Sequence, residues 1–162
     1  MLLVEDDRRT ALAYDALLAV KRPDLVVETV FCAEQALRHL SMSSYDLILS
    51  DFRLPGLDGL GLLVASYCLH SPVPFVLISA YGDRELEARA VRLDAYAVLH
   101  KPVTPEALMQ VVERALTTGR RAIEQGRRLN EVFNTSIPRR EKHGGERKTK
   151  IWQPSMTSRR VP

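Results

Sequence analysis

The sequence predicts an α/β protein built on a doubly wound parallel β-sheet with helices on both faces. Short apolar runs typical of buried strands alternate five times with segments whose apolar residues recur at helical spacing. Several of the apolar runs stop at an acidic or hydroxyl residue that a loop follows. Alternating strands and helices favour a parallel sheet joined by right-handed crossovers. The 162 residues suffice for one such domain with its own core.

The first strand is predicted at residues 2–4 and stops at the acidic stretch 5–7. Its apolar part is shorter than the length of about five or six residues typical of strands, so we expect its natural start to lie upstream. Asp7 is suited to the N-terminus of the following helix, and Pro23 ends it. The apolar residues of this helix at helical spacing are Leu12, Ala16, Ala19 and Val20.

The second unit is expected to begin with a strand at residues 25–27. A helical pattern follows and ends before a turn at residues 41–44. The inner face of this helix is expected at Ala33, Ala36, Leu37 and Leu40.

The third strand is expected at residues 47–51, and its apolar run ends at Asp51. Ligands of open α/β sheets bind beyond the carboxyl ends of the strands, so Asp51 is a candidate functional residue. The alternative is that Asp51 only caps the next helix. Pro55 and Gly56 stand between them, so Asp58 is the better N-cap. The helix, from about Gly59, is expected to bury Leu60, Leu63, Val64 and Tyr67.

The last two units repeat the pattern. The fourth strand is expected at residues 75–78 and ends at Ser79, and the helix over residues 83–93 has a thin apolar face. The fifth strand is expected at residues 95–99 and leads to Lys101. The last helix, with Thr104 as its N-cap and Pro105 in its first turn, has its apolar stripe at Leu108, Val111, Val112, Ala115 and Leu116.

Charge divides the chain. Residues 1–118 carry 16 acidic and 11 basic side chains, whereas residues 119–162 carry 4 and 12. We expect this basic tail to be partly helical, then disordered from Pro138 onward, and to hold no output domain. Its Lys and Arg clusters could contact nucleic acid, although a solvated tail is the simpler interpretation of such a composition.

The sequence has no apolar run of membrane-spanning length and no charged-then-apolar leader. Cys32 and Cys68 form neither a CxxC pair nor a metal-binding spacing. We therefore expect two reduced thiols in a cytoplasmic protein.

Four predicted strands end in groups that carry chemistry, and these ends meet at one edge of a parallel sheet. Two like charges about 4 Å apart repel by roughly 4 kcal/mol at an effective dielectric constant near 20. One lysine cannot comfortably neutralise three carboxylates, whereas a divalent cation can. Oxygen ligands without histidine or cysteine favour Mg²⁺ over Zn²⁺. The strand-end groups are Glu5 and Asp6, Asp51, Ser79, and Lys101.

A carboxylate beside Mg²⁺, a lysine and a hydroxyl suits phosphoryl transfer. Asp51 would be the nucleophile. Mg²⁺ and the Lys101 ammonium would neutralise the oxygens of the moving phosphoryl group, and Ser79 would donate a hydrogen bond to one of them.

Each of these residues also has a plainer interpretation. Lys101 could be a surface lysine, and Ser79 could satisfy a turn at the end of its strand. The acids at residues 5–7 could serve only the N-terminus of the first helix. Their joint placement at successive strand ends is what these interpretations explain poorly.

Residues 1–118 resemble a response-regulator receiver domain of two-component signalling. No single motif is specific, but the set with this spacing is. The motifs that carry the resemblance are Leu3-Val4-Glu5-Asp6-Asp7, the loop from Asp51 to Gly59, Ser79-Ala80, and Lys101-Pro102.

The resemblance implies a flavodoxin-like fold with strand order 2-1-3-4-5. It implies that Asp51 accepts a phosphoryl group and that Lys101 contacts this group. Asp6, Asp51 and the backbone carbonyl of Arg53 would bind Mg²⁺ directly, with Glu5 acting through water. It also implies a cis peptide bond between Lys101 and the following proline.

The chain departs from the family pattern at Val98, where an aromatic residue usually lies three positions before the lysine. Tyr96 is predicted on the same strand face as Val98 by the period of two, but it is displaced along the strand. Valine is stiff and has no hydroxyl, so we expect the switch to depend instead on the helix over residues 83–93 and the loop before it.

The leading hypothesis is a stand-alone receiver that a sensor histidine kinase or phosphotransfer protein phosphorylates and that signals through protein contacts. The alternative is the input domain of a truncated DNA-binding transcriptional regulator. An enzyme is less consistent with the residues, because dehalogenase-type phosphatases need a second Asp where Arg53 stands. A flavodoxin would need a hydroxyl-rich loop after the first strand, and here that loop is acidic.

Overall fold

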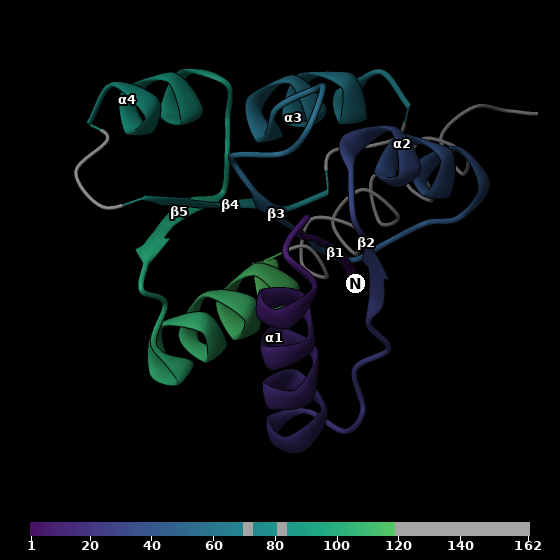
Figure 1. The fold of residues 1–162 in the computed structure, drawn as a ribbon, viewed down its shortest axis with the longest axis vertical. Coiled ribbons are helices and arrows are strands. Elements are labelled where there is room, and N and C mark those ends of the chain that lie inside the picture. The colour runs from purple at the N-terminus through teal and green to yellow at the C-terminus, as the bar shows by residue number, and fades with distance from the viewer. Residues whose placement is uncertain (70–72, 81–83, 119–162) are drawn as a thin grey trace, which may run out of the picture.

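A computed structural model describes residues 1–69, 73–80 and 84–118. Its centre is a parallel sheet of five strands in the order β2-β1-β3-β4-β5, as the resemblance implied. Figure 1 shows this sheet crossing the middle of the molecule. The strands are β1 (Leu2–Val4), β2 (Glu28–Val30), β3 (Ile48–Asp51), β4 (Phe75–Ala80) and β5 (Ala97–Lys101).

Helices cover both faces of the sheet (Figure 1). The helices α2, α3 and α4 lie on one face, and α1 lies on the other with the helix over residues 105–118. Asp7, Asp58 and Thr104 cap α1, α3 and the 105–118 helix, as predicted, by accepting hydrogen bonds from backbone N–H groups. The labelled helices are α1 (Arg8–Lys21), α2 (Ala33–Met42), α3 (Gly59–Tyr67) and α4 (Arg84–Arg92).

The strands supply alternate residues to two hydrophobic cores. Leu2 and Leu77 pack toward α2, α3 and α4, whereas Leu3 and Ile78 pack toward α1 and the 105–118 helix. This alternation follows from the period of two along a strand. It explains why β1, β3 and β4 read as continuous apolar runs, since a central parallel strand is buried on both faces.

Two strands begin later than the sequence predicts. The segment 25–27 was expected to start the second strand, but β2 begins at Glu28, because Glu28 is the residue that pairs with Leu2. β2 lies at the sheet edge, where apolar residues are not required on both faces, and Val26 is exposed. The fifth strand is also shifted by two residues, so that His100 and Lys101 belong to β5.

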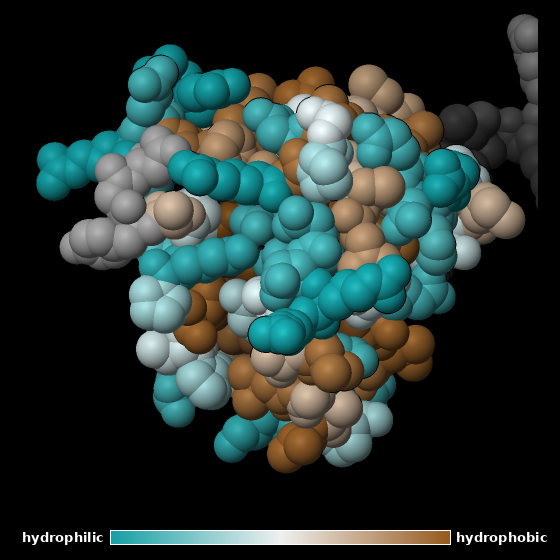
Figure 2. Space-filling model, in the orientation of Figure 1, coloured by the Kyte–Doolittle hydropathy of each residue, from teal (hydrophilic) through white to brown (hydrophobic). Residues whose placement is uncertain are grey.

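The apolar face of α1 differs from the expected one. Ala11, Tyr14 and Leu18 are buried, whereas Leu12 is 68% exposed and Val20 is 78% exposed. Apolar residues occur all around α1, so periodicity alone does not select a face, and packing against the sheet decides. In Figure 2 hydrophobic surface gathers over the lower part of the molecule, where Figure 1 places α1.

The helices α2, α3 and α4 follow their patterns more closely. The expected inner face of α2 is buried apart from Leu37, which packs at its edge. In α3 the expected burial of Leu60 and Leu63 is confirmed, but the expected burial of Val64 and Tyr67 is wrong, because they face solvent and are 45% and 37% exposed. The apolar face of α4 is thin, as predicted: within its bounds only Leu86 and Ala90 are buried.

Several expectations fall on residues that the structure does not describe. The basic tail, residues 119–162, and the loop at residues 81–83 lie outside the described ranges. Within those ranges Cys32 and Cys68 are free thiols. No helix there has both the length and the apolar character needed to cross a membrane.

We predict that Gly59→Ala destabilises the protein by about 1–3 kcal/mol, the usual effect of overpacking. A Cβ atom on Gly59 would lie 2.5 Å from the backbone oxygen of Asp51 and 2.9 Å from Cα of Phe52, and a backbone cannot move as a side chain can. Urea denaturation measures the change.

The matched control is Gly61→Ala, two residues further along α3. Its Cβ would meet the side chain of Leu57, which can rotate away, and alanine favours a helix over glycine by about 1 kcal/mol. Equal destabilisation by the two substitutions would show that the close approach of α3 to Asp51 is unimportant.

Candidate functional site

The sheet brings the predicted site residues to one edge. The register pairs Val4 with Ser50 and Ala80 with Lys101 across adjacent strands. Glu5 therefore emerges beside Asp51 at the carboxyl ends of β1 and β3. Glu5, Asp51 and Ser79 are buried, with 1%, 6% and 1% of their surface exposed.

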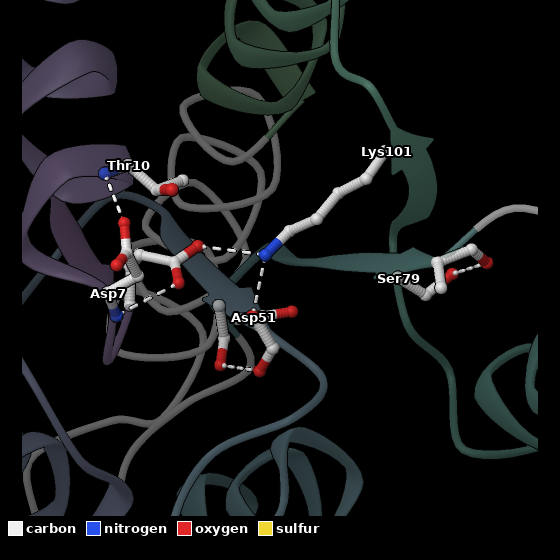
Figure 3. A network of polar contacts seen from close by, with 8 residues as sticks. Asp7, Thr10, Asp51, Ser79 and Lys101 are labelled. Carbon is white, nitrogen blue, oxygen red and sulfur yellow. Dashed lines mark hydrogen bonds and ion pairs between the residues drawn. The ribbon is translucent and has the colours of Figure 1, made fainter.

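Lys101 links the two buried acids. Its Nζ atom donates a hydrogen bond to Oδ2 of Asp51 at 2.7 Å and another to Oε2 of Glu5 at 3.2 Å. Figure 3 shows the long side chain reaching from β5 to these carboxylates. The peptide bond between Lys101 and Pro102 is cis, as the resemblance implied. The strand-end lysine is therefore part of the site and not a plain surface residue.

The pKa values of Glu5 and Lys101 are shifted by burial and by the neighbouring charges. Burial raises the pKa of Glu5, and the nearby charge of Asp51 raises it further, while Lys101 acts in the opposite direction. Burial acts to lower the pKa of Lys101, but its hydrogen bond to Asp51 and the attraction of both acids outweigh this, so the pKa is raised. The two carboxylates therefore stabilise the charged form of Lys101.

The acids fit a divalent cation. Glu5, Asp6 and Asp51 each offer a carboxylate oxygen, and these atoms all lie within 4.8 Å of one another. Lys101 supplies a single positive charge, so the group keeps a negative excess when all three acids are ionised. A donor set of oxygens alone suits Mg²⁺. Arg53 is exposed in the loop after β3, and its carbonyl as a ligand stays a prediction.

The loops around the acids are held by local hydrogen bonds. Oε1 of Glu5 accepts a hydrogen bond from the backbone N–H of Asp7, which itself caps α1. The backbone N–H of Gly59 donates to the carbonyl of Phe52, and the hydroxyl of Ser50 donates to the carbonyl of Asp51. The backbone on both sides of Asp51 is therefore fixed.

The structure adds a residue that the sequence analysis did not identify. Oγ of Ser79 lies 3.3 Å from Nδ1 of His100, and the other ring nitrogen of His100 is bonded to the carboxylate of Glu87 on α4. In Figure 3 no dashed line joins Ser79 to Asp51 or Lys101. His100 lies next to Lys101 in the sequence, and a correct register for β5 would have placed it beside Ser79.

Tyr96 does not share a face with Val98, contrary to the expectation from the period of two. Val98 packs with the core under α4, whereas Tyr96 packs with the core under the 105–118 helix, where its hydroxyl lies 3.4 Å from that of Thr118. The reason is that β5 begins at Ala97, so Tyr96 precedes the strand and does not follow its alternation.

Comparison with known proteins agrees with this geometry. A sequence model described as "Response regulator receiver domain" matches residues 1–113. The chain therefore belongs to the response regulator receiver domain family.

Two curated relatives are transcription or response regulators by name. The chain is 30% identical over 138 residues to the C4-dicarboxylate transport transcriptional regulatory protein DctD of Rhizobium meliloti. This match covers 84% of this chain and 30% of the relative. It is 37% identical over 116 residues to the response regulator protein FleR of Pseudomonas aeruginosa, covering 70% of this chain and 24% of the relative. The chain thus spans less than a third of the length of each.

A solved structure supports the same fold. The receiver domain of NtrX from Brucella abortus matches with a TM-score of 0.67 and 33% identity, over 72% of this chain and 98% of that one. Nearly all of that receiver domain is therefore matched by the present chain.

We predict that Mg²⁺ raises the thermal midpoint of the protein and that Asp6→Ala removes most of this shift. A ligand at ten times its Kd stabilises the folded state by about 1.4 kcal/mol. Asp6 is exposed, so its loss alone changes stability by only about 0.5 kcal/mol. Thermal melts with and without millimolar Mg²⁺ measure both effects.

The control is Asp7→Ala, which removes the neighbouring acid. This change takes away the N-cap of α1 and lowers stability by about 1 kcal/mol, but Asp7 is not in the acidic cluster, so the Mg²⁺ shift remains. A full shift in Asp6→Ala would show that the cluster is not the site.

Proposed function

We propose that this chain is a signalling receiver that accepts one phosphoryl group on Asp51 from a phosphohistidine of a sensor kinase or phosphotransfer protein. The observation that carries the proposal is the position of Asp51: it is buried at the end of β3, bonded to Lys101, and clustered with Glu5 and Asp6. Family membership supports the same assignment.

In the proposed step a carboxylate oxygen of Asp51 attacks the phosphorus atom. A P–O bond forms while the P–N bond to the donor imidazole breaks, and the leaving imidazole takes up a proton. Glu5, Asp6 and Asp51 would hold the Mg²⁺, with the carbonyl of Arg53, and the ion would supply charge neutralisation at the phosphoryl oxygens.

Lys101 and Ser79 have distinct roles in this proposal. The Lys101 ammonium, now paired with Asp51, transfers its hydrogen bond to a phosphoryl oxygen and balances the added negative charge. The Ser79 hydroxyl donates to another phosphoryl oxygen. The domain acts as a phosphoryl acceptor, and its chemistry is limited to gaining and losing that group.

A second candidate is the input domain of a DNA-binding transcriptional regulator. The observation that favours it is the name of the curated relatives, since DctD is a transcriptional regulatory protein. In either case we propose that residues 1–118 form the receiver and that residues 119–162 form a basic tail, whose charge would allow contact with a polyanion such as nucleic acid.

We expect acetyl phosphate with Mg²⁺ to add one phosphoryl group to the protein. The product is an acyl phosphate, so hydroxylamine removes it, and EDTA prevents its formation. Intact mass spectrometry counts the groups added, and peptide mapping locates the group at Asp51.

Asp51→Asn abolishes this labelling because an amide is a far weaker nucleophile than a carboxylate. The control is Asp58→Asn, seven residues further on, since Asp58 caps α3 and asparagine also caps helices. Labelling of Asp51→Asn at the wild-type level would refute the assignment.

A further inference from the structure

Three elements meet in one chain of polar contacts beside the proposed phosphorylation site. Ser79 of β4 and His100 of β5 are register partners, with Oγ and Nδ1 3.3 Å apart. The Nε2 atom of His100 is bonded to Oε1 of Glu87 on α4. The contacts therefore run from the strand end to the helix that packs over β5.

The chemistry of these groups sets the direction of the hydrogen bonds. A carboxylate only accepts hydrogen bonds, so in the neutral form of the imidazole the single ring hydrogen lies on Nε2, facing Glu87. Nδ1 then carries a lone pair and accepts from the hydroxyl of Ser79. Ser79 also lies 3.4 Å from the carbonyl of Ala80, but donation there would leave two lone pairs facing each other across 3.3 Å.

We propose that His100 is a positioning residue for Ser79 and that it couples phosphorylation of Asp51 to α4 through Glu87. The coupling rests on the function proposed above, in which Ser79 donates to the phosphoryl group. A serine hydroxyl has one hydrogen. When that hydrogen turns to a phosphoryl oxygen, Nδ1 of His100 loses the Ser79 hydroxyl as a donor, and the contact with Glu87 rearranges in response.

The helix α4, where these polar contacts end, is suited to move when the contacts of His100 change. Within its bounds only Leu86 and Ala90 of α4 are buried, so few apolar contacts oppose its movement. The Glu87–His100 pair is a polar link from α4 to β5, and a change at His100 alters it directly. Two states of similar free energy suffice, and the phosphoryl group need only favour one.

His100 also lies where a side-chain switch has to lie. The period of two places it on the same face of β5 as Val98, toward α4. Val98 is apolar and has no hydrogen-bonding group, and Tyr96 packs with the opposite core. Among the described residues of β5, His100 is the one that bonds both Ser79 and α4.

Two substitutions separate the bond of the imidazole to Ser79 from its bond to Glu87. An asparagine at position 100 places a polar atom near the Nδ1 position and does not reach Glu87. A glutamine places its amide near the Nε2 position and leaves Ser79 without its partner. Beryllofluoride serves as the phosphoryl mimic, its affinity is measured by titration, and the response of residues 84–92 is measured by hydrogen exchange.

His100→Gln frees the hydroxyl of Ser79, so beryllofluoride binds about three- to tenfold more tightly than to wild type, the effect of one neutral hydrogen bond. His100→Asn keeps a partner for Ser79 and therefore binds beryllofluoride with the wild-type affinity. In both variants the exchange response of α4 to beryllofluoride is lost. Glu85→Gln, an exposed change on the same helix, keeps the wild-type affinity and response.

Nitrogen NMR of the His100 imidazole in the wild-type protein tests the coupling between Asp51 and α4 without any substitution. We expect the hydrogen on Nε2 and a hydrogen-bonded lone pair on Nδ1, and a changed Nδ1 signal at saturating beryllofluoride. His39 of α2, which contacts Glu28 and Tyr45, is the internal control and stays unchanged.

An unchanged Nδ1 signal, or wild-type affinity and α4 response in His100→Gln, overturns the coupling while leaving the proposed function intact. Failure of wild-type protein to bind beryllofluoride overturns the proposed function and the coupling with it. The two failures are therefore distinguishable.

Discussion

The ion pair between Lys101 and Asp51 is the interaction on which the site depends. Asp51 and Glu5 are buried side by side, and burying charges is unfavourable unless they are paired. Lys101 reaches both from the far end of the sheet, and its raised pKa keeps it charged. One lysine leaves the group acidic, which is the condition under which a divalent cation binds. We propose that a divalent cation neutralises the negative charge that Lys101 leaves uncompensated.

The rest of the fold keeps these charges in place. The parallel register brings the ends of β1, β3 and β5 together, and the caps of α1 and α3 fix the loops between them. Gly59 allows α3 to begin against the backbone of Asp51, where any side chain would collide. The acidic edge is consequently held by hydrogen bonds and by the close contact of α3 on the side of β1 and β3.

On the side of β4 and β5 the contacts are polar and partly exposed. Ser79 is buried, but its partner His100 is half-exposed and bonded to α4, a helix with little apolar contact. This polar connection lies on β5 two residues beyond Val98, the position at which the family pattern has an aromatic side chain. We propose that this polar connection carries a local change at Asp51 to α4, because few buried apolar residues hold that helix.

The sequence by itself determined the strand and helix order, the caps Asp7, Asp58 and Thr104, and the strand-end positions of Asp51, Glu5 and Lys101, because strand ends and helix N-termini carry local chemical signals. It did not determine the start of β5, the face of α1, or the orientation of Tyr96, since these depend on which residues pair and pack across the sheet. The contact between Ser79 and His100 joins residues 21 positions apart and appears only when the two strands are in register. Tertiary structure decided it, because a shift of one residue along a strand moves every side chain to the other face.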